Sequence, residues 1–447
     1  MTRSTGWRLL LAGAAVLSAS LAHAQLLHGG LGGVPGGVAS LPGQLLNGSA
    51  VTPDISRAGA VVGDLGLGPA TEGLAPPSLL DLRRERLRAI IQANRSQLEA
   101  DRSGNPVRRG EVIAIDPSPG DLTRAEAAGF RRLREETQPD LNLAMTVLAP
   151  PKGKSAADGL QVIHDLDPTG AFELNHVFEP AGGGLNPLHE PNTHGAGLGS
   201  VGNGEAIGMI DGGVGAHPCL ASAMIEQRGF APGGPKPTGH GTAIASLLIG
   251  SDIVFAGAAR GRALLVADVY GGQAAAGSAE AIVDGLAWLA SRKVEVVTIS
   301  LVGPPNLLLQ RGVDALRARG ILVVAAVGND GPAAPPLYPA SYPGVVAVTG
   351  VDARDHALLE AGRAAHLDFA APGADMAAAV PGRGYSVVRG TSVAAPLVAA
   401  RLALAGGDAP HALAAVTAEA RPGHGVVGRG VVCEDCRNDP RRVHAQK

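Results

Sequence analysis

The sequence predicts an α/β protein in which a doubly wound parallel sheet follows a small α+β domain. After residue 204, short unbroken apolar runs alternate with helical stretches. Runs such as 321–326 lack the polar alternation of a strand with one solvated face, as expected when helices cover both faces of a parallel sheet. A shorter block, 109–178, alternates strand and helix signals and predicts a separate split β-α-β unit.

Composition narrows the classes of function. The chain has 447 residues, which is enough for two domains with extensions, and a formal net charge of −3. It carries no dense basic stripe, so we expect no nucleic-acid partner. Aromatic residues make up only 3% while there are 64 glycines and 33 prolines. The cores therefore rely on Ala, Val, Leu and Ile, and part of the chain is loop.

Residues 1–24 have the pattern of an export signal. Arg3 and Arg8 supply a positive start, the apolar run Leu9–Leu17 follows, and Ala22-His23-Ala24 is a small-x-small cleavage site. The run is shorter than the roughly 20 residues of a membrane-spanning helix, which disfavours the alternative of an anchor. We expect a secreted or periplasmic protein with no transmembrane segment after signal removal.

Residues 25–108 are predicted to be a low-complexity leader followed by a basic amphipathic helix. The leader is rich in Gly, Leu, Pro and Ser and cannot bury enough surface to fold alone. From Leu79 to Ala100, apolar residues recur at helical spacing with four arginines between them. We expect this helix to pack its apolar face on a neighbour and to leave the arginines in solvent, and a membrane surface is the alternative partner.

The α+β domain, 109–178, contains three strands and two helices in alternation. The expected elements are the strand Val112–Ile115, the helix Leu122–Glu136 opened by Asp121, the strand Leu141–Leu148, the helix Ala156–Leu166 and the strand Phe172–Phe178. Residues 179–203 are rich in Gly and Pro and are predicted to be a linker.

The second domain is predicted over 204–415. Its expected elements are the strands Ala206–Ile210, Ala263–Val269, Val294–Ile299, Ile321–Val327 and Val345–Val348 and the helices His240–Ile249 and Ala279–Ser291. In such sheets, sites gather beyond the C-terminal ends of the strands. Residues 416–447 are interpreted as a C-terminal tail without an assigned function. Its Cys433 and Cys436 are expected to form a local disulfide, with a redox-active pair or half a zinc site as alternatives.

Three short motifs carry the side chains needed for acyl transfer. Asp211 ends an apolar run, His240 opens a helical stretch, and Ser392 begins a small-residue helix. Singly they have ordinary explanations as a turn, a surface histidine and an N-cap. Together they provide a hydroxyl nucleophile, an imidazole to take its proton and a carboxylate to fix the imidazole tautomer.

The order of these motifs resembles that of the subtilisin-like serine peptidase, or subtilase, family. The resemblance rests on Ile210–Gly213, His240–Thr242 and Gly390–Pro396, and it covers roughly 204–404. It implies a subtilisin-like fold and a secreted serine endopeptidase, a hydrolase of polypeptide substrates without a cofactor. Asp211, His240 and Ser392 would be its catalytic triad. A catalytically silent binding module of the cell envelope is the alternative, and a structural surface protein is a third hypothesis.

The resemblance implies further roles. Asn329 is similar to the family's oxyanion-hole asparagine and would act beside the backbone N–H of Ser392. The expected substrate-binding residues are Ser300, Leu301, Val302, Gly303, Ala326, Val327 and Gly328. The α+β domain is similar in element order to the family's ferredoxin-like propeptide. It would be an intramolecular inhibitor of a self-processing zymogen, cut in or before 179–204, and a permanently attached regulatory domain is the alternative.

The sequence also departs from the family pattern. Gly212 stands where a Thr or Ser usually helps to hold the aspartate, so we expect a more loosely held carboxylate. Val393 and Ala395 are smaller changes near the serine. Residues 250–254 offer a single carboxylate, Asp252, and a calcium site needs six to eight oxygen ligands, so no metal site is predicted.

Overall fold

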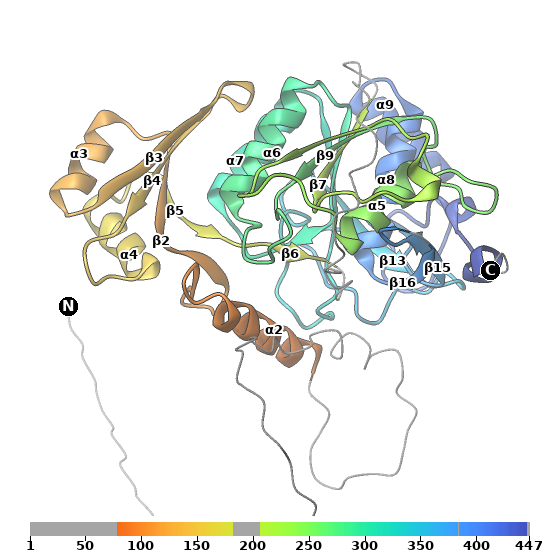
Figure 1. Ribbon diagram of the computed structural model, residues 1–447, viewed down its shortest axis with the longest axis horizontal. Coiled ribbons are helices and arrows are strands. Elements are labelled where there is room, and N and C mark those ends of the chain that lie inside the picture. Colours follow the sequence, from red (N-terminus) through yellow and green to blue (C-terminus); the bar gives the residue numbers. More distant parts are fainter. Residues whose placement is uncertain (1–77, 182–205, 383, 445–447) are drawn as a thin grey trace, which may run out of the picture. The chain divides into compact units, whose positions relative to one another are not determined.

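The computed structural model describes residues 78–181, 206–382 and 384–444, all of which belong to one compact unit within 52–447 (Figure 1). The predicted export signal and low-complexity leader lie outside the described residues. Among the helices of the described ranges, none is long and apolar enough to cross a membrane.

The N-terminal part is built on a five-stranded antiparallel sheet. Helix α2 (Leu79–Ala93) precedes it, and its strands are β1 (Leu98–Ala100), β2 (Pro106–Ile115), β3 (Arg131–Gln138), β4 (Leu143–Ala149) and β5 (Phe172–His176). The order is β1-β2-β4-β3, and β5 also pairs with β2. Helices α3 (Pro119–Ala127) and α4 (Ala156–Leu166) follow β2 and β4 in the chain.

Successive side chains of β2 point to opposite faces of the sheet and belong to two different cores. Val112 and Ala114 pack with residues of α3 and α4. Ile113 and Ile115 belong instead to a core that includes residues of the C-terminal part. This is the period of two that a strand with both faces covered must show.

The larger part is a parallel sheet with helices on both faces. Its seven strands are β7 (Ala206–Asp211), β8 (Ile225–Gly229), β9 (Ala263–Asp268), β10 (Val296–Ile299), β12 (Leu322–Ala326), β13 (Val346–Val351) and β14 (Phe369–Pro372). Their order is β14-β13-β12-β10-β7-β9-β8, and all neighbours are parallel. The predicted doubly wound sheet is confirmed.

Two apolar cores separate the faces of this sheet. Helices α5 (Gly239–Ile249) and α8 (Thr391–Ala405) pack on one face, beside strand residues such as Met209 and Val324. Helices α6 (Ala279–Ser291) and α7 (Leu307–Ala318) pack on the other, beside Ile210 and Val323. Because the parallel strands all end on one edge, Asp211 and the residues following β10 and β12 lie near one another.

Charged side chains join the N-terminal sheet to α6. Arg134 of β3 forms an ion pair with Glu280 of α6 and a second one, at 2.9 Å, with Glu111 of β2. Asn175 of β5 donates a hydrogen bond to Glu280 at 2.9 Å. Gln138 of β3 reaches the next turn of α6 and donates to Asp284 at 2.6 Å. The sheet is therefore held to the helix by polar as well as apolar contacts.

The pH dependence of stability should report on this interface. Burial, with the charges of Glu136 and Glu280 adding to it, raises the pKa of Asp284 to about 8, and burial with the charge of Glu280 raises the pKa of Glu136. The folded chain holds these protons more tightly than the unfolded chain, so the free energy of unfolding should fall as the pH rises from about 4 towards 8. Thermal melts of the full-length chain across this range should show the slope.

Asp284→Asn should flatten that slope because the side chain no longer ionises. Asp314→Asn is the matched control, since Asp314 is a half-exposed acid of α7 paired with Arg317 at 3.2 Å. A slope unchanged in Asp284→Asn would show that the acids of this interface do not set the pH dependence.

Two predicted helices are wrong at their C-terminal ends. The helix expected over Leu122–Glu136 begins at Pro119, is capped by Ser118 and ends at Ala127. Gly129, at φ +91°, turns the chain out of the helix, and Arg131–Gln138 pairs with β4 instead. The helix expected to reach Ala100 ends at Ala93, because Leu98–Ala100 adds an edge strand to β2.

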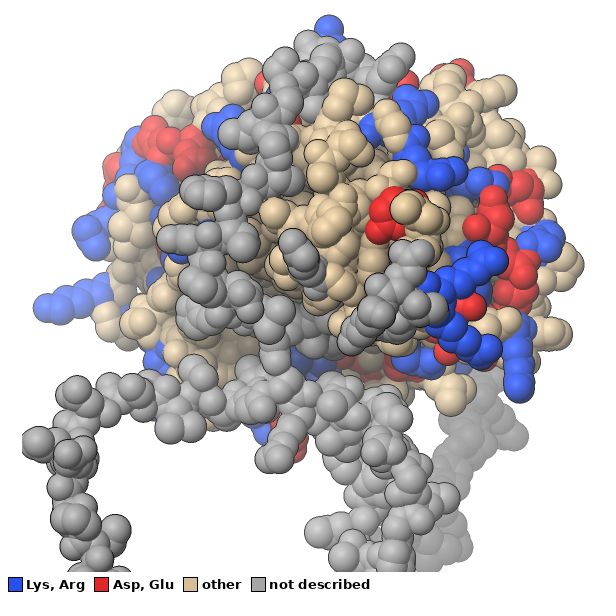
Figure 2. All heavy atoms as spheres, turned by 45° about the vertical axis from the view of Figure 1, so that its right-hand side comes forward, with Lys and Arg blue, Asp and Glu red and all other residues tan. Residues whose placement is uncertain are grey.

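Lys, Arg, Asp and Glu side chains are interspersed on the face that Figure 2 draws. On the face drawn in Figure 2, blue and red groups stand next to one another towards the edges, and the centre of the described surface is mostly uncharged. This face carries no broad basic area of the kind that binds phosphate backbones.

The C-terminal segment packs on the parallel-sheet domain. After α9 (Ala409–Glu419), Val431 pairs with Arg421, and Val432 and Val443 are buried in the core beside α5 and α8. Short helix α10 spans Pro440–His444, and the hairpin β15 (Met376–Ala379) and β16 (Tyr385–Val388) lies against it. The interpretation of this segment as a tail did not anticipate that packing.

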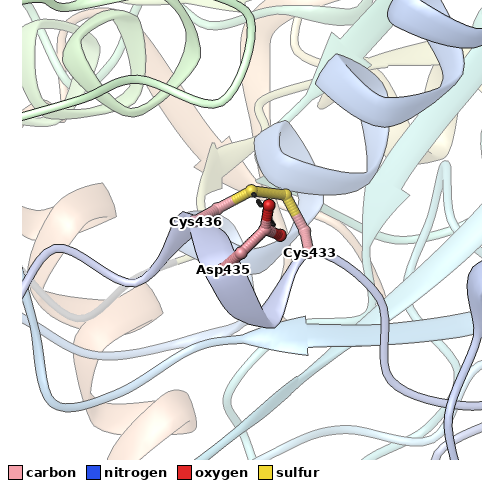
Figure 3. Close-up of side chains that lie close together, drawn as sticks. All are labelled: Cys433, Asp435 and Cys436. Atoms are coloured by element: carbon pink, nitrogen blue, oxygen red, sulfur yellow. Dashed lines mark hydrogen bonds between the residues drawn. A yellow bond between two sulfur atoms is a disulfide. The ribbon is translucent and has the colours of Figure 1, made fainter.

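The expected disulfide is confirmed. Cys433 and Cys436 are bonded to each other, and both are buried (Figure 3). Together with Asp435 they form the single group of three potential metal ligands in the described part of the chain. Both sulfurs are already joined, so neither is the free thiolate that a zinc site requires.

Candidate active site

Asp211 and His240 form a buried pair between a strand end and a helix start. Asp211 is the last residue of β7, and His240 is in the first turn of α5. Nδ1 of His240 lies 2.9 Å from Oδ1 and 2.8 Å from Oδ2 of Asp211, and both residues are buried. A carboxylate on Nδ1 holds the proton on that nitrogen and leaves Nε2 as a base. Nε2 is buried and has no hydrogen-bond partner among the described residues.

Gly212 makes room for the residue that caps the His240 helix. The side chain of Thr238 accepts a hydrogen bond from Gly241 N at 2.9 Å, and a Cβ on Gly212 would lie 2.4 Å from Thr238 Oγ1. The N–H of Gly212 itself donates to Asp211 Oδ1 at 2.7 Å. Besides His240, the Asp211 carboxylate thus has the Gly212 N–H as a partner, and the expectation of a more loosely held carboxylate stays a prediction.

Gly212→Ala should destabilise the protein because the added methyl group overlaps Thr238. Overpacking of this kind costs about 1 to 3 kcal/mol of unfolding free energy, which thermal or denaturant melts would measure. Gly120→Ala in α3 is the matched control, since a Cβ there meets its nearest atom at 3.4 Å, an ordinary contact. Equal melting of the two variants would contradict the proposed overlap.

A second buried carboxylate, Asp268, accompanies Asp211. The two residues end the neighbouring strands β9 and β7 in register. Asp268 accepts hydrogen bonds from the N–H groups of Lys236, Tyr270 and Gly271 at 2.8, 2.8 and 3.0 Å. Burial raises its pKa, and the charge of Asp211 raises it further. The sequence analysis missed Asp268, although its place at the end of an apolar strand matches that of Asp211.

Asn329 contacts the two residues that precede Ser392 at the start of α8. Ser392 is the second residue of the helix, and its carbonyl oxygen accepts from Ser300 Oγ at 2.9 Å. The N–H of Thr391 donates to Asn329 Oδ1 at 2.9 Å, which orients the amide and leaves Nδ2 to donate elsewhere. Gly390, at φ 134°, is needed here, because a Cβ would lie 2.8 Å from that nitrogen.

Residues 178–181 of the chain occupy the predicted substrate edge. Strand β6 (Glu179–Pro180) pairs antiparallel with β11 (Leu301–Val302). The N–H of Ala181 donates to Ser300 O at 2.8 Å, and Asn329 Nδ2 donates to the carbonyl oxygen of Ala181. The linker predicted from residue 179 thus begins with ordered backbone, because β11 supplies a pairing edge that local sequence does not show.

Phe178 anchors the far end of this segment. Its ring is fully buried against Gly303, where a Cβ would lie 2.5 Å from the ring. Its N–H donates to Gly277 O at 2.7 Å, and its carbonyl oxygen accepts from the hydroxyl of Tyr270 at 2.9 Å. Neither Gly277 nor Tyr270 was predicted, since both come from a loop after β9 with no distinctive motif.

The predicted site residues thus gather at one edge of the sheet. Ser300, Leu301, Val302 and Gly303 line residues 178–181, and the buried residues Ala326, Val327 and Gly328 lead from β12 to Asn329. Helices α5 and α8, which carry His240 and Ser392, pack against each other. In the described structure no hydrogen bond joins His240 Nε2 to Ser392 Oγ.

Sequence comparison finds close matches for the parallel-sheet domain. A sequence model of the Subtilase family matches residues 202–421. Subtilisin Savinase of Lederbergia lenta is 34% identical over 227 residues, which are 49% of this chain and 82% of that protein. M-protease of Shouchella clausii (strain KSM-K16) is 32% identical over 251 residues, which are 54% of this chain and 64% of that protein. The match thus covers slightly less than two thirds of M-protease.

Structural comparison extends over more of the chain. The structure of fervidolysin from Fervidobacterium pennivorans, described as a keratinolytic enzyme related to subtilisin, aligns with a TM-score of 0.59 at 18% identity. The alignment covers 74% of this chain and 61% of that one, and it supports the fold.

Proposed function

This chain belongs to the subtilase family, and from that membership we propose that it is a serine endopeptidase acting through an acyl-enzyme. One observation carries the proposal. A stretch of the chain's own backbone pairs with the predicted substrate edge, and its Ala181 carbonyl oxygen accepts a hydrogen bond from Asn329. This is the position in which a scissile carbonyl group would be activated.

The proposed mechanism assigns one step to each side chain. Asp211 keeps the Nδ1 proton of His240 in place, so that Nε2 takes the proton of Ser392 Oγ as this oxygen attacks the carbonyl carbon. The negative oxygen of the tetrahedral intermediate accepts hydrogen bonds from Asn329 Nδ2 and from the N–H of Ser392. His240 then returns the proton to the leaving amine, and a water molecule activated in the same way releases the acyl group.

We further propose that the chain is a zymogen that cuts itself after Ala181. Residues 98–181 would be an intramolecular inhibitor, held by the Arg134–Glu280 ion pair between β3 and α6 and by the burial of Phe178. Cleavage of the Ala181–Gly182 bond would convert residues 178–181 from substrate to bound product. Release of the N-terminal part would then open the cleft.

Export is also part of the proposal. The signal pattern of residues 1–24 supports it, and so does the Cys433–Cys436 disulfide, since such bonds persist in oxidising compartments. Comparison of full-length and signal-deleted chains by cell fractionation would test it. Retention of both chains in the cytoplasm would contradict export.

Active-site labelling would test the proposed activity. The signal-less protein is purified, incubated until its mass is constant, and treated with a fluorophosphonate probe. We expect the label on the peptide containing Ser392 and an N-terminal fragment ending at Ala181. A folded chain that neither labels nor cuts, even after trypsin has removed its N-terminal part, would instead support the silent binding module.

A further inference from the structure

Two arginines of α2 bind the residue that follows Asn329. Arg83 Nε lies 2.9 Å from Asp330 Oδ2, out of line for a hydrogen bond, and Arg86 Nη2 donates to Asp330 Oδ1 at 2.9 Å. The Arg83 and Asp330 side chains are only 9% and 4% exposed. Leu79 packs on Gly331, where a Cβ would lie 3.0 Å from Leu79 Cδ1. Helix α2 therefore covers the loop beside the proposed oxyanion hole.

Arg86 also binds the segment that lies in the cleft. Its Nε and Nη2 donate to the two carboxylate oxygens of Glu179 at 2.8 and 3.0 Å. Burial alone would lower the pKa of Arg86, but the charges of Glu179 and Asp330 raise it. Because the same Nη2 contacts both acids, the carboxylates of Glu179 and Asp330 lie within the span of one guanidinium group.

The backbone register ties Asp330 to one position of any bound peptide. Glu179 is opposite Val302, and it is the third residue before the bond proposed to be cut. A substrate that adds to β11 in the same register places its own third residue there, with its side chain on the same side. In a complex with substrate, the side chain of the third residue before the cut would therefore lie near Asp330, and its charge would depend on the substrate sequence.

In the precursor the third residue before the cut is the acidic Glu179, and Arg86 of α2 neutralises the repulsion between Glu179 and Asp330. Glu179 and Asp330 would repel each other without Arg86 between them. In the described part of the chain, both cations that contact Asp330 come from α2. When α2 leaves with the cleaved N-terminal part, Asp330 loses both partners and faces the cleft as an unpaired carboxylate.

We propose that Asp330 is a specificity-determining residue that favours Lys or Arg as the third residue before the scissile bond, and that Arg83 and Arg86 mask it in the precursor. This rests on the proposed endopeptidase function. A basic side chain of the substrate takes the place that Arg86 holds in the precursor. Residues 178–181, with Glu179, end the cleaved N-terminal part and leave together with α2, so the cleft and Asp330 are opened to substrate in one step.

The test uses the processed enzyme, freed of its N-terminal part, and three peptide p-nitroanilides that differ at one residue. They are Phe-Lys-Pro-Ala, Phe-Gln-Pro-Ala and Phe-Glu-Pro-Ala, and the last reproduces residues 178–181. We expect kcat/KM to fall in that order, with Lys over Glu by about tenfold at low salt, since each contact is a partly exposed ion pair, and by less at high salt.

Asp330→Asn should bring the three values together, because the amide carries no charge that distinguishes Lys from Glu. Asp314→Asn, which makes the same change of charge on α7, should keep the preference. Equal rates for Lys and Glu in the wild type, or a preference that survives in Asp330→Asn, would overturn the proposal. If no peptide is cut, including the Gln peptide, the endopeptidase function itself fails.

A second measurement does not depend on changing Asp330. Arg86→Ala in the full-length chain should slow self-cleavage, because Glu179 and Asp330 then repel each other directly. Adding Glu179→Lys to that variant should restore the rate, since the new cation can pair with Asp330. A double variant that is slower than Arg86→Ala would overturn the proposal.

Discussion

Ser392→Ala should lower kcat for peptide hydrolysis by about 10⁶-fold and leave the full-length chain uncut. The change removes the oxygen that would form the acyl-enzyme, while Asp211, His240 and Asn329 remain in place. Residual activity comes only from binding and from the oxyanion donors. Kinetics on a chromogenic peptide and intact mass after prolonged incubation measure the two effects.

Ser291→Ala provides the control for this substitution. Ser291 ends α6, and its hydroxyl donates to Trp288 O at 2.7 Å within the same helix. We expect normal rates and normal self-cleavage from this variant. Cleavage after Ala181 that persists in Ser392→Ala, in protein free of other proteases, would show that Ser392 is not the nucleophile.

Asp211→Asn should reduce kcat/KM by about 10⁴-fold with little change in fold. The amide can donate a hydrogen bond to Nδ1 of His240, which then places the imidazole proton on Nε2, where it blocks proton transfer from the serine. Steady-state kinetics and a melting curve of the same preparation would separate loss of activity from loss of structure.

A second Asp→Asn change tests whether this effect is specific. Asp408 caps α9, and its side chain accepts from His411 N at 2.9 Å, a role that Asn fills equally well. Asp408→Asn should therefore retain full activity. If Asp211→Asn were as active as this control, His240 would not depend on Asp211 for its tautomer.

The parallel-sheet domain could be predicted well because its strands are buried on both faces. A run such as Val323–Ala326 has no polar position to interrupt it, and the helix predicted over Ala279–Ser291 agrees with α6 residue for residue. Each proposed catalytic residue lies at the end of a buried element: Asp211 ends strand β7, and His240 and Ser392 are in the first turns of helices α5 and α8. Their approach to one edge of the sheet follows from the topology of parallel strands.

The contacts of α2 could not be predicted from the sequence. Arg83 and Arg86 fall among charged neighbours and look like the solvated side of an amphipathic helix, as the sequence analysis expected. Their partner Asp330 lies 244 residues beyond Arg86, and Glu179 lies 93 residues beyond it. A helix pattern records which residues share a face, but it does not record that the opposing surface is acidic.

Short strands formed by distant partners were missed for a similar reason. Strand β6 has two residues, one of them a proline, and exists because β11 offers it an edge. Strand β8, 225–229, carries polar residues because it lies at the edge of the parallel sheet. Local propensity is weak in both, and pairing determines the outcome.

The attachment of the C-terminal segment would affect the resistance of such a protein to autolysis. A peptidase cuts chain that can be drawn out into its cleft, so a loosely attached end is the first site of autolysis. Here Arg437 donates to Ala374 O and Asp352 O, Asn438 exchanges hydrogen bonds with the backbone of Ala256, and a disulfide closes the turn before them. These closely spaced contacts, at 433–438, hinder local unfolding of that segment and so its entry into the cleft of another copy.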